Sequence, residues 1–151
     1  MIRHRVVHLA RRFRGAISSA PPPAADDVWA VRQLTAAQAA LWWDMMHQDR
    51  RHSVQVARRF LECVPEAPRA AVAAALLHDV GKTESRLGVL ARVVTTVLGP
   101  RTERWRSYHD HERLGISMLR DAGSDPLTLA LLDGTSPDTA LVDALRDADD
   151  I

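Results

Sequence analysis

The sequence predicts an all-α protein. Apolar residues recur at spacings of three and four along most of the chain, and prolines and glycines divide it into segments of helical length. No segment alternates apolar and polar residues as a half-exposed strand does. With 151 residues, 46% of them hydrophobic, the chain is long enough to bury one core. We therefore expect a single helical domain.

Residues 1–24 form a separate segment in this prediction. The first 20 residues are basic and contain no acid, and on a helix their apolar residues share one face away from the arginines. Arginines interrupt each apolar stretch, which argues against a secretory signal. Such a helix packs on the domain or on an oligomer partner, or it binds an anionic membrane or nucleic acid. A linker at Pro21-Pro22-Pro23 then separates it from a domain over residues 25–151.

Capping residues, prolines and glycines bound the helices of that domain. Thr35 is the predicted N-cap of the first of them and Ser136 of the last, while Pro65, Gly81, Gly99 and Gly123 follow predicted ends. The expected helices are 36–45, 49–64, 68–79, 86–98, 102–122, 127–132 and 137–150.

Charge and composition exclude several classes of protein. Twenty basic and nineteen acidic residues leave a net charge of +1, so we expect no DNA or RNA partner. No apolar run approaches the roughly 20 residues that cross a bilayer, so we expect no transmembrane segment. The single cysteine, Cys63, excludes an intramolecular disulfide and lies in an apolar helical pattern. We predict a buried thiol and a cytoplasmic location from it.

Ionisable residues on the predicted core side of three helices indicate a cation site. His52 borders an apolar arc, His78 and Asp79 end a helix that is apolar nearly all round, and Asp149 projects inside the apolar face of the last helix, unlike Asp147. Taken singly, each residue also has another explanation: a core histidine with its hydrogen bonds satisfied for His52, a salt bridge for Asp79, and a frayed helix end for Asp149. Together, however, two imidazoles and two carboxylates favour a cation, because an unpaired buried carboxylate is costly. Such mixed ligands suit Mn, Fe, Ni, Co, Zn or Mg.

Further residues suit an anionic ligand nearby. His111 lies on an inward arc, and Gly115, one turn later, leaves space for a ligand or another helix. Lys82 is the only lysine among twenty basic residues and follows the His-Asp pair by three positions. It either faces a phosphate or caps the helix. Arg50 and Arg51 precede the first histidine and are either solvated surface or reach an anionic substrate.

Four segments resemble the signature of the HD superfamily of metal-dependent phosphohydrolases. The resemblance runs from about Thr35 to the C-terminus. The segments are His52-Ser-Val-Gln-Val-Ala, Leu77-His78-Asp79-Val80-Gly81-Lys82, His111-Glu-Arg-Leu-Gly115 and Leu145-Arg-Asp-Ala-Asp149. Residues 131–135 lack the His-His pair and the GYP segment of HD-GYP phosphodiesterases. This departure argues against cyclic-dinucleotide hydrolysis and against a fully ligated two-metal site.

The resemblance implies a compact HD-domain bundle of about five core helices, to which the residue pattern adds the N-terminal amphipathic helix. It also implies one divalent metal ion, held by His52, His78, Asp79 and Asp149. The implied catalytic residues are Asp79, which orients water or accepts its proton, and His111, which contacts the phosphate or leaving group or approaches a second cation. Lys82 joins them on the sequence pattern, as a point charge that suits a phosphate.

The implied function is hydrolysis of a small phosphorylated molecule, such as a nucleotide or another phosphomonoester. The alternative is a non-catalytic regulatory module that binds the metal and a phosphorylated ligand and signals through the N-terminal helix. A homo-oligomer is compatible with either function.

Overall fold

The computed structural model describes residues 20–83 and 104–150, without the side chains of residues 83 and 104–111. Seven α-helices and one 3-10 helix form this part of the chain, and none of it is a strand. The all-α prediction is therefore confirmed. The elements are α2 (Ala24–Gln33), α3 (Ala36–Asp44), α4 (His47–Cys63), α5 (Arg69–Leu77), η1 (Val80–Thr83), α7 (Arg104–Asp121), α8 (Pro126–Leu132) and α9 (Thr139–Asp149).

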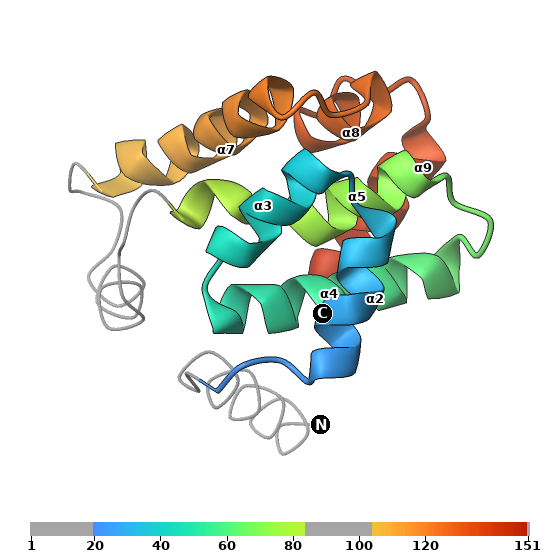
Figure 1. Cartoon of the computed structure of the whole chain (residues 1–151). Helices are drawn as coiled ribbons and strands as arrows, with labels where there is room; N and C mark the ends of the chain where they lie inside the picture. The colour runs from blue at the N-terminus through green and yellow to red at the C-terminus, as the bar shows by residue number, and fades with distance from the viewer. Residues whose placement is uncertain (1–19, 84–103, 151) are drawn as a thin grey trace, which may run out of the picture.

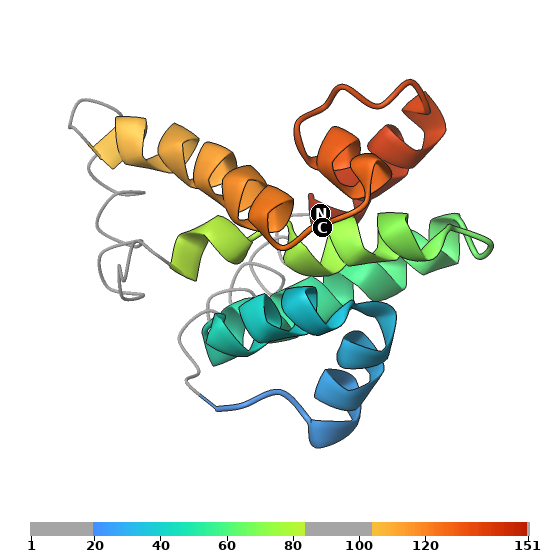
Figure 2. The same ribbon diagram turned by 45° about the horizontal axis from the view of Figure 1, so that its top comes forward.

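Helix α5 is the centre of the bundle. Its residues from Ala71 to Leu77 are all buried, as a helix apolar on nearly every side requires. It packs on α4, α8 and α2, while α9 packs on α4 and α7 packs on η1 and α8. Figures 1 and 2 show α4 on one side of α5, with α7 and α8 on the other. The end of α5 therefore meets several elements that are distant in sequence.

Local signals account for several helix boundaries. The Thr35 side chain accepts a hydrogen bond from the backbone N–H of Gln38, and the Gln38 side chain accepts one from the Thr35 N–H. This capping box satisfies two donors that have no partner within the helix. Pro68 is the N-cap of α5, and Pro126 is the first residue of α8. Proline suits these positions because they need no backbone donor.

Helix α2 was not predicted. Its N-cap is Pro23, so the prolines that suggested a linker lead directly into a helix. Asp26 and Asp27 lie in the first turn, where the helix dipole favours negative charge. Asp27 is buried and accepts a hydrogen bond from Trp42 Nε1 at 3.0 Å, and its carboxylate lies 3.5 Å from Arg50 Nη1. This buried network ties α2 to α3 and α4.

Some details of the sequence prediction were wrong. Helix α9 begins at Thr139, not Pro137, and its N-cap is Asp138, whose carboxylate accepts from the Leu141 N–H at 3.2 Å. The longer, charged acceptor thus replaces Ser136 as cap. Cys63 is exposed at the end of α4. The predicted helices at residues 1–20 and 86–98 lie outside the described residues.

A close glycine contact joins α7 to η1. A Cβ on Gly115 would lie 3.1 Å from the backbone nitrogen of Gly81 and 3.4 Å from its Cα. The space beside Gly115 therefore admits the backbone of η1, one of the two occupants that the sequence suggested. Within the described residues, no helix is both long and apolar enough to cross a bilayer.

Candidate metal centre

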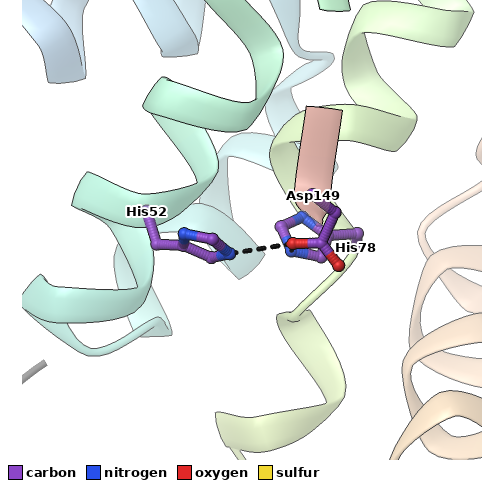
Figure 3. A group of neighbouring side chains, drawn as sticks. All are labelled: His52, His78 and Asp149. Atoms are coloured by element: carbon purple, nitrogen blue, oxygen red, sulfur yellow. Dashed lines mark hydrogen bonds and ion pairs between the residues drawn. The ribbon is translucent and has the colours of Figure 1, made fainter. Parts of the chain in front are cut away.

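Three helix segments bring His52, His78 and Asp149 together. His52 lies near the start of α4, His78 is the C-cap of α5, and Asp149 is the last residue of α9. One ligand atom from each lies within 4.8 Å of the other two. Figure 3 shows the His52 ring pointing toward the Asp149 carboxylate, with the His78 ring next to it. Arg59 Nη1 donates to the carbonyl of Ala148 at 3.1 Å, which holds the end of α9 against α4. The packing of α4 against both other helices thus places the three groups at one point.

The distances within this cluster are short. His52 Nε2 lies 3.0 Å from Asp149 Oδ1, and His78 Nε2 lies 3.4 Å from the same oxygen. The two imidazole rings meet edge to face with centroids 5.4 Å apart. Two ligand atoms that each lie about 2.1 Å from a first-row transition-metal ion, with a right angle between the two metal–ligand bonds, are roughly 3 Å apart. The cluster therefore has the spacing of a ligand set.

The second histidine offers a buried ring nitrogen that lacks a hydrogen bond. His78 Nδ1 lies 2.9 Å from the carbonyl oxygen of Ala75, so it carries the proton and donates to that oxygen. Nε2 then presents a lone pair, and it is buried without a hydrogen-bond partner. Asp149 Oδ1 and Asp79 Oδ2 lie 3.4 and 3.6 Å from it. Because a nitrogen lone pair and carboxylate oxygens are all acceptors, a proton or a cation must lie between Nε2 and these oxygens.

Electrostatics favour positive charge at this point. Burial opposes the charged form of His78, but the nearby carboxylates of Asp149 and Asp79 outweigh it and raise the pKa of the ring. The imidazoles of His52 and His78, whose Nε2 atoms lie 3.0 and 3.4 Å from Asp149 Oδ1, hold the pKa of Asp149 well below its usual range. Burial alone would raise the pKa of Asp79, but the charges of His78 and Lys82 lower it. Both carboxylates therefore stay ionised and suit a divalent cation.

Asp79 lies beside the cluster and pairs with Lys82. Asp79 follows the C-cap His78 in the turn before η1, so α5 ends at Leu77 and not at Asp79 as predicted. Lys82 Nζ lies 2.5 Å from Asp79 Oδ1, while Oδ2 faces His78. The three-residue cluster does not include Asp79. The structure thus groups three of the four predicted ligands tightly, with the fourth next to His78 and held by the predicted lysine.

The site is more open than the helical pattern suggested. The side chains of His78 and Asp79 are 13% and 10% exposed, but those of His52 and Asp149 are 38% and 48% exposed. The inward projection expected for Asp149 is therefore only partial, because it occupies the final position of α9. A cation bound here would have one protected side and one side open to ligands.

Other predicted site residues have different surroundings. His111 lies in α7, but its side chain is outside the described residues, so its role remains a prediction. Arg50 is buried and pairs with Asp27, and its guanidinium lies 4.9 Å from the ring centroid of Trp43. It is thus neither solvated nor directed to a substrate. Arg51 donates to the carbonyl of Ala20.

A pocket of about 410 Å³ opens beside the cluster. Its lining includes Lys82 and Asp149, which were predicted site residues, together with Val142 and Arg146, which were not. A signal for the second pair was present, since positions 142, 145, 146 and 149 lie on one face of a helix. The volume falls within the range of small-molecule sites.

These features define an all-α protein with a histidine-aspartate cluster next to a ligand-sized pocket. Residues 49–148, which are 100 of the 151 residues, match the HD domain family, and the chain belongs to this family. The HD domain family consists largely of metal-dependent hydrolases. The match ends one residue before Asp149, so the assignment of that residue depends on its geometry. Searches of curated proteins and of solved structures found no match.

Proposed function

We propose that this protein is a phosphohydrolase that uses one divalent metal ion to hydrolyse a small phosphomonoester such as a nucleotide. The observation that carries the proposal is the buried Nε2 of His78, which lacks a hydrogen bond and faces two carboxylates beside a ligand-sized pocket. Membership of the HD domain family supports it. The proposal places the reaction in the cytoplasm, with neither DNA nor RNA as partner.

His52, His78 and Asp149 would hold the cation, with Asp79 Oδ2 as the fourth ligand atom. This donor set of imidazole nitrogens and carboxylate oxygens fits Mn, Fe, Ni, Co, Zn or Mg. When bound, such a cation supplies an activated water and neutralises charge on the phosphate. Ala75 supports the set, because its carbonyl fixes the His78 ring with Nε2 toward the cluster.

Asp79 and Lys82 would act on the reacting groups. The lowered pKa of Asp79 keeps it a carboxylate, which orients water or accepts a proton from it. Lys82 lines the pocket with its ammonium held 2.5 Å from Asp79 Oδ1. In that position a compact positive charge can bind a phosphate oxygen. His111, on the helix packed against η1, is the further group proposed to contact the phosphate.

Metal content and phosphate release test the proposal directly. We expect about one equivalent of metal per chain in the wild type and in Asp147→Asn, an exposed carboxylate of α9, and little metal in Asp79→Asn. Circular dichroism would verify that each variant is helical. Phosphate release from a nucleotide panel, with each metal restored, would then establish hydrolysis. Bound metal without turnover would favour the regulatory module, and absence of metal after every loading condition would refute the site.

A further inference from the structure

The pocket beside the cluster has walls of different chemistry. Its charged part contains Asp79, Lys82 and Asp149, next to the proposed cation. Helices α8 and α9 supply an aliphatic wall formed by Leu131, Leu132, Val142 and Leu145. The lining also includes the charged side chains of Glu112, Asp133 and Arg146. A ligand held at the charged end can therefore place its organic group against the four aliphatic side chains, with these polar groups elsewhere in the pocket.

One face of α9 shows how these walls are arranged. Val142, Leu145, Arg146 and Asp149 lie at relative positions 0, 3, 4 and 7, so they follow one another along the same face. At about 1.5 Å per residue, Leu145 lies roughly 6 Å and Val142 roughly 10 Å along the helix from Asp149. From the carboxylate of Asp149 to the aliphatic side chain of Val142 this face thus spans about 10 Å, the dimension of a small organic ester, with Arg146 next to Leu145 along it.

The aliphatic wall is only partly covered by the protein. Leu132, Val142 and Leu145 pack against the core but remain partly exposed. Leu131, in the same wall, is 5% exposed. Covering such side chains with an apolar group is favourable by about 25 cal/mol per Å² of apolar surface removed from water. The wall therefore favours an apolar group over a hydrated polyol.

We propose that this pocket selects phosphomonoesters whose organic group is apolar or aromatic, over compact hydrophilic esters such as sugar phosphates. The phosphate lies at Lys82 and the cation, and the organic group extends along α9 over Leu145 to Val142. A nucleobase or an aryl ring fits this description. The inference rests on the proposed function, because the proposed cation fixes which end of the ligand is anionic.

Binding of two unreactive phosphonates tests the inference independently of turnover. Phenylphosphonate and methylphosphonate carry the same anionic group and differ in the apolar group. Calorimetric titration of the metal-loaded wild type should show phenylphosphonate binding at least about tenfold more tightly, as partial burial of one ring predicts. Equal affinities, or no binding of either phosphonate, would overturn the inference.

Variants of the aliphatic wall locate the preference. Leu132→Asn and Val142→Thr should each reduce the affinity ratio to roughly threefold or less. Leu129→Asn, a partly buried position of α8 outside the pocket lining, should leave the ratio unchanged. Val142→Thr keeps the side-chain shape, so it still tests the wall if Leu132→Asn fails to fold. A ratio that falls equally in Leu129→Asn would contradict the assignment.

Hydrolysis of phenyl phosphate and glycerol 2-phosphate separates this inference from the proposed function. Faster turnover of phenyl phosphate, with a higher kcat/KM, would support both. Equal kcat/KM values for the two esters would overturn the inference and leave the hydrolase intact. Selective binding of phenylphosphonate without hydrolysis of either ester would support the pocket assignment and refute the catalytic proposal.

Discussion

Replacing Asp149 by asparagine separates the metal-binding role of its carboxylate from its contribution to folding. Asp149 Oδ1 lies within 3.4 Å of both histidine Nε2 atoms, and its side chain is 48% exposed. The amide keeps an acceptor oxygen for His52, and ion pairs this exposed contribute about 0–1 kcal/mol. The metal-free variant should therefore unfold within about 4 °C of the metal-free wild type, at 2–4 °C per kcal/mol for a chain of this size.

The metal-bound proteins should differ far more. A cation at 100 times its Kd stabilises the wild type by about 2.7 kcal/mol, which raises Tm by roughly 5–10 °C. If the loss of charge weakens binding about 100-fold, the same concentration equals the Kd of the variant. The stabilisation is then about 0.4 kcal/mol, and the rise in Tm is about 1 °C.

Thermal unfolding followed by circular dichroism, with and without added Mn²⁺ after chelation, measures both effects. Asp147→Asn is the matched control, because it makes the same change at an exposed position of the same helix, two residues earlier. It should keep the full metal-induced shift. A shift of 5–10 °C in Asp149→Asn as well would refute the assignment of this carboxylate as a ligand.

Three further substitutions test the supporting structure. Gly115→Ala places a methyl group 3.1 Å from the backbone of η1 and should destabilise the fold by about 1–3 kcal/mol in urea unfolding. Trp42→Phe removes the donor to the buried carboxylate of Asp27 and should cost about 1–3 kcal/mol by the same measurement, with the metal-induced rise in Tm unchanged. Lys82→Met removes the positive charge proposed to bind the phosphate. It should lower kcat/KM at least about tenfold for any ester that the wild type hydrolyses, while the protein still binds metal.

Each of these expectations has an opposite outcome. Wild-type stability in Gly115→Ala would contradict the close contact between α7 and η1. A Trp42→Phe variant with wild-type stability would show that its indole N–H contributes little, and loss of metal binding in it would link the buried network to the site. Unchanged kcat/KM in Lys82→Met would restrict the lysine to pairing with Asp79.

The sequence predicted most of the helices because their ends carry local chemical signals. Thr35 is the N-cap of α3 and completes a capping box there, and Pro68 stands immediately before α5 as its N-cap. The same reasoning missed α2, because three consecutive prolines suggested a linker while Pro23 serves as N-cap. The burial of Arg50 was also missed. It depends on Asp27, on a helix that was not predicted.

The candidate site was predictable to the extent that helix faces and motif order determine it. His52, His78 and Asp149 lie together, although His52 and Asp149 are 97 residues apart in the sequence. The half-open position of Asp149 was not predictable, because a helical wheel describes direction around an axis and not where a neighbouring helix stops. The aliphatic wall of the pocket could not be predicted, because it depends on how α8 and α9 are placed relative to each other. No local sequence pattern contains that information.

The single oxygen shared by His52 and His78 has a consequence for dynamics. A cation at this point would fasten the start of α4 to the end of α9 and close a loop of nearly one hundred residues. Helix ends normally fray first, and their amides exchange by local opening. With the cation bound, opening of α9 would require release of the ion, so backbone amides in both helices should exchange more slowly together. Hydrogen exchange would then detect the cation as a cooperative link between two distant parts of the chain.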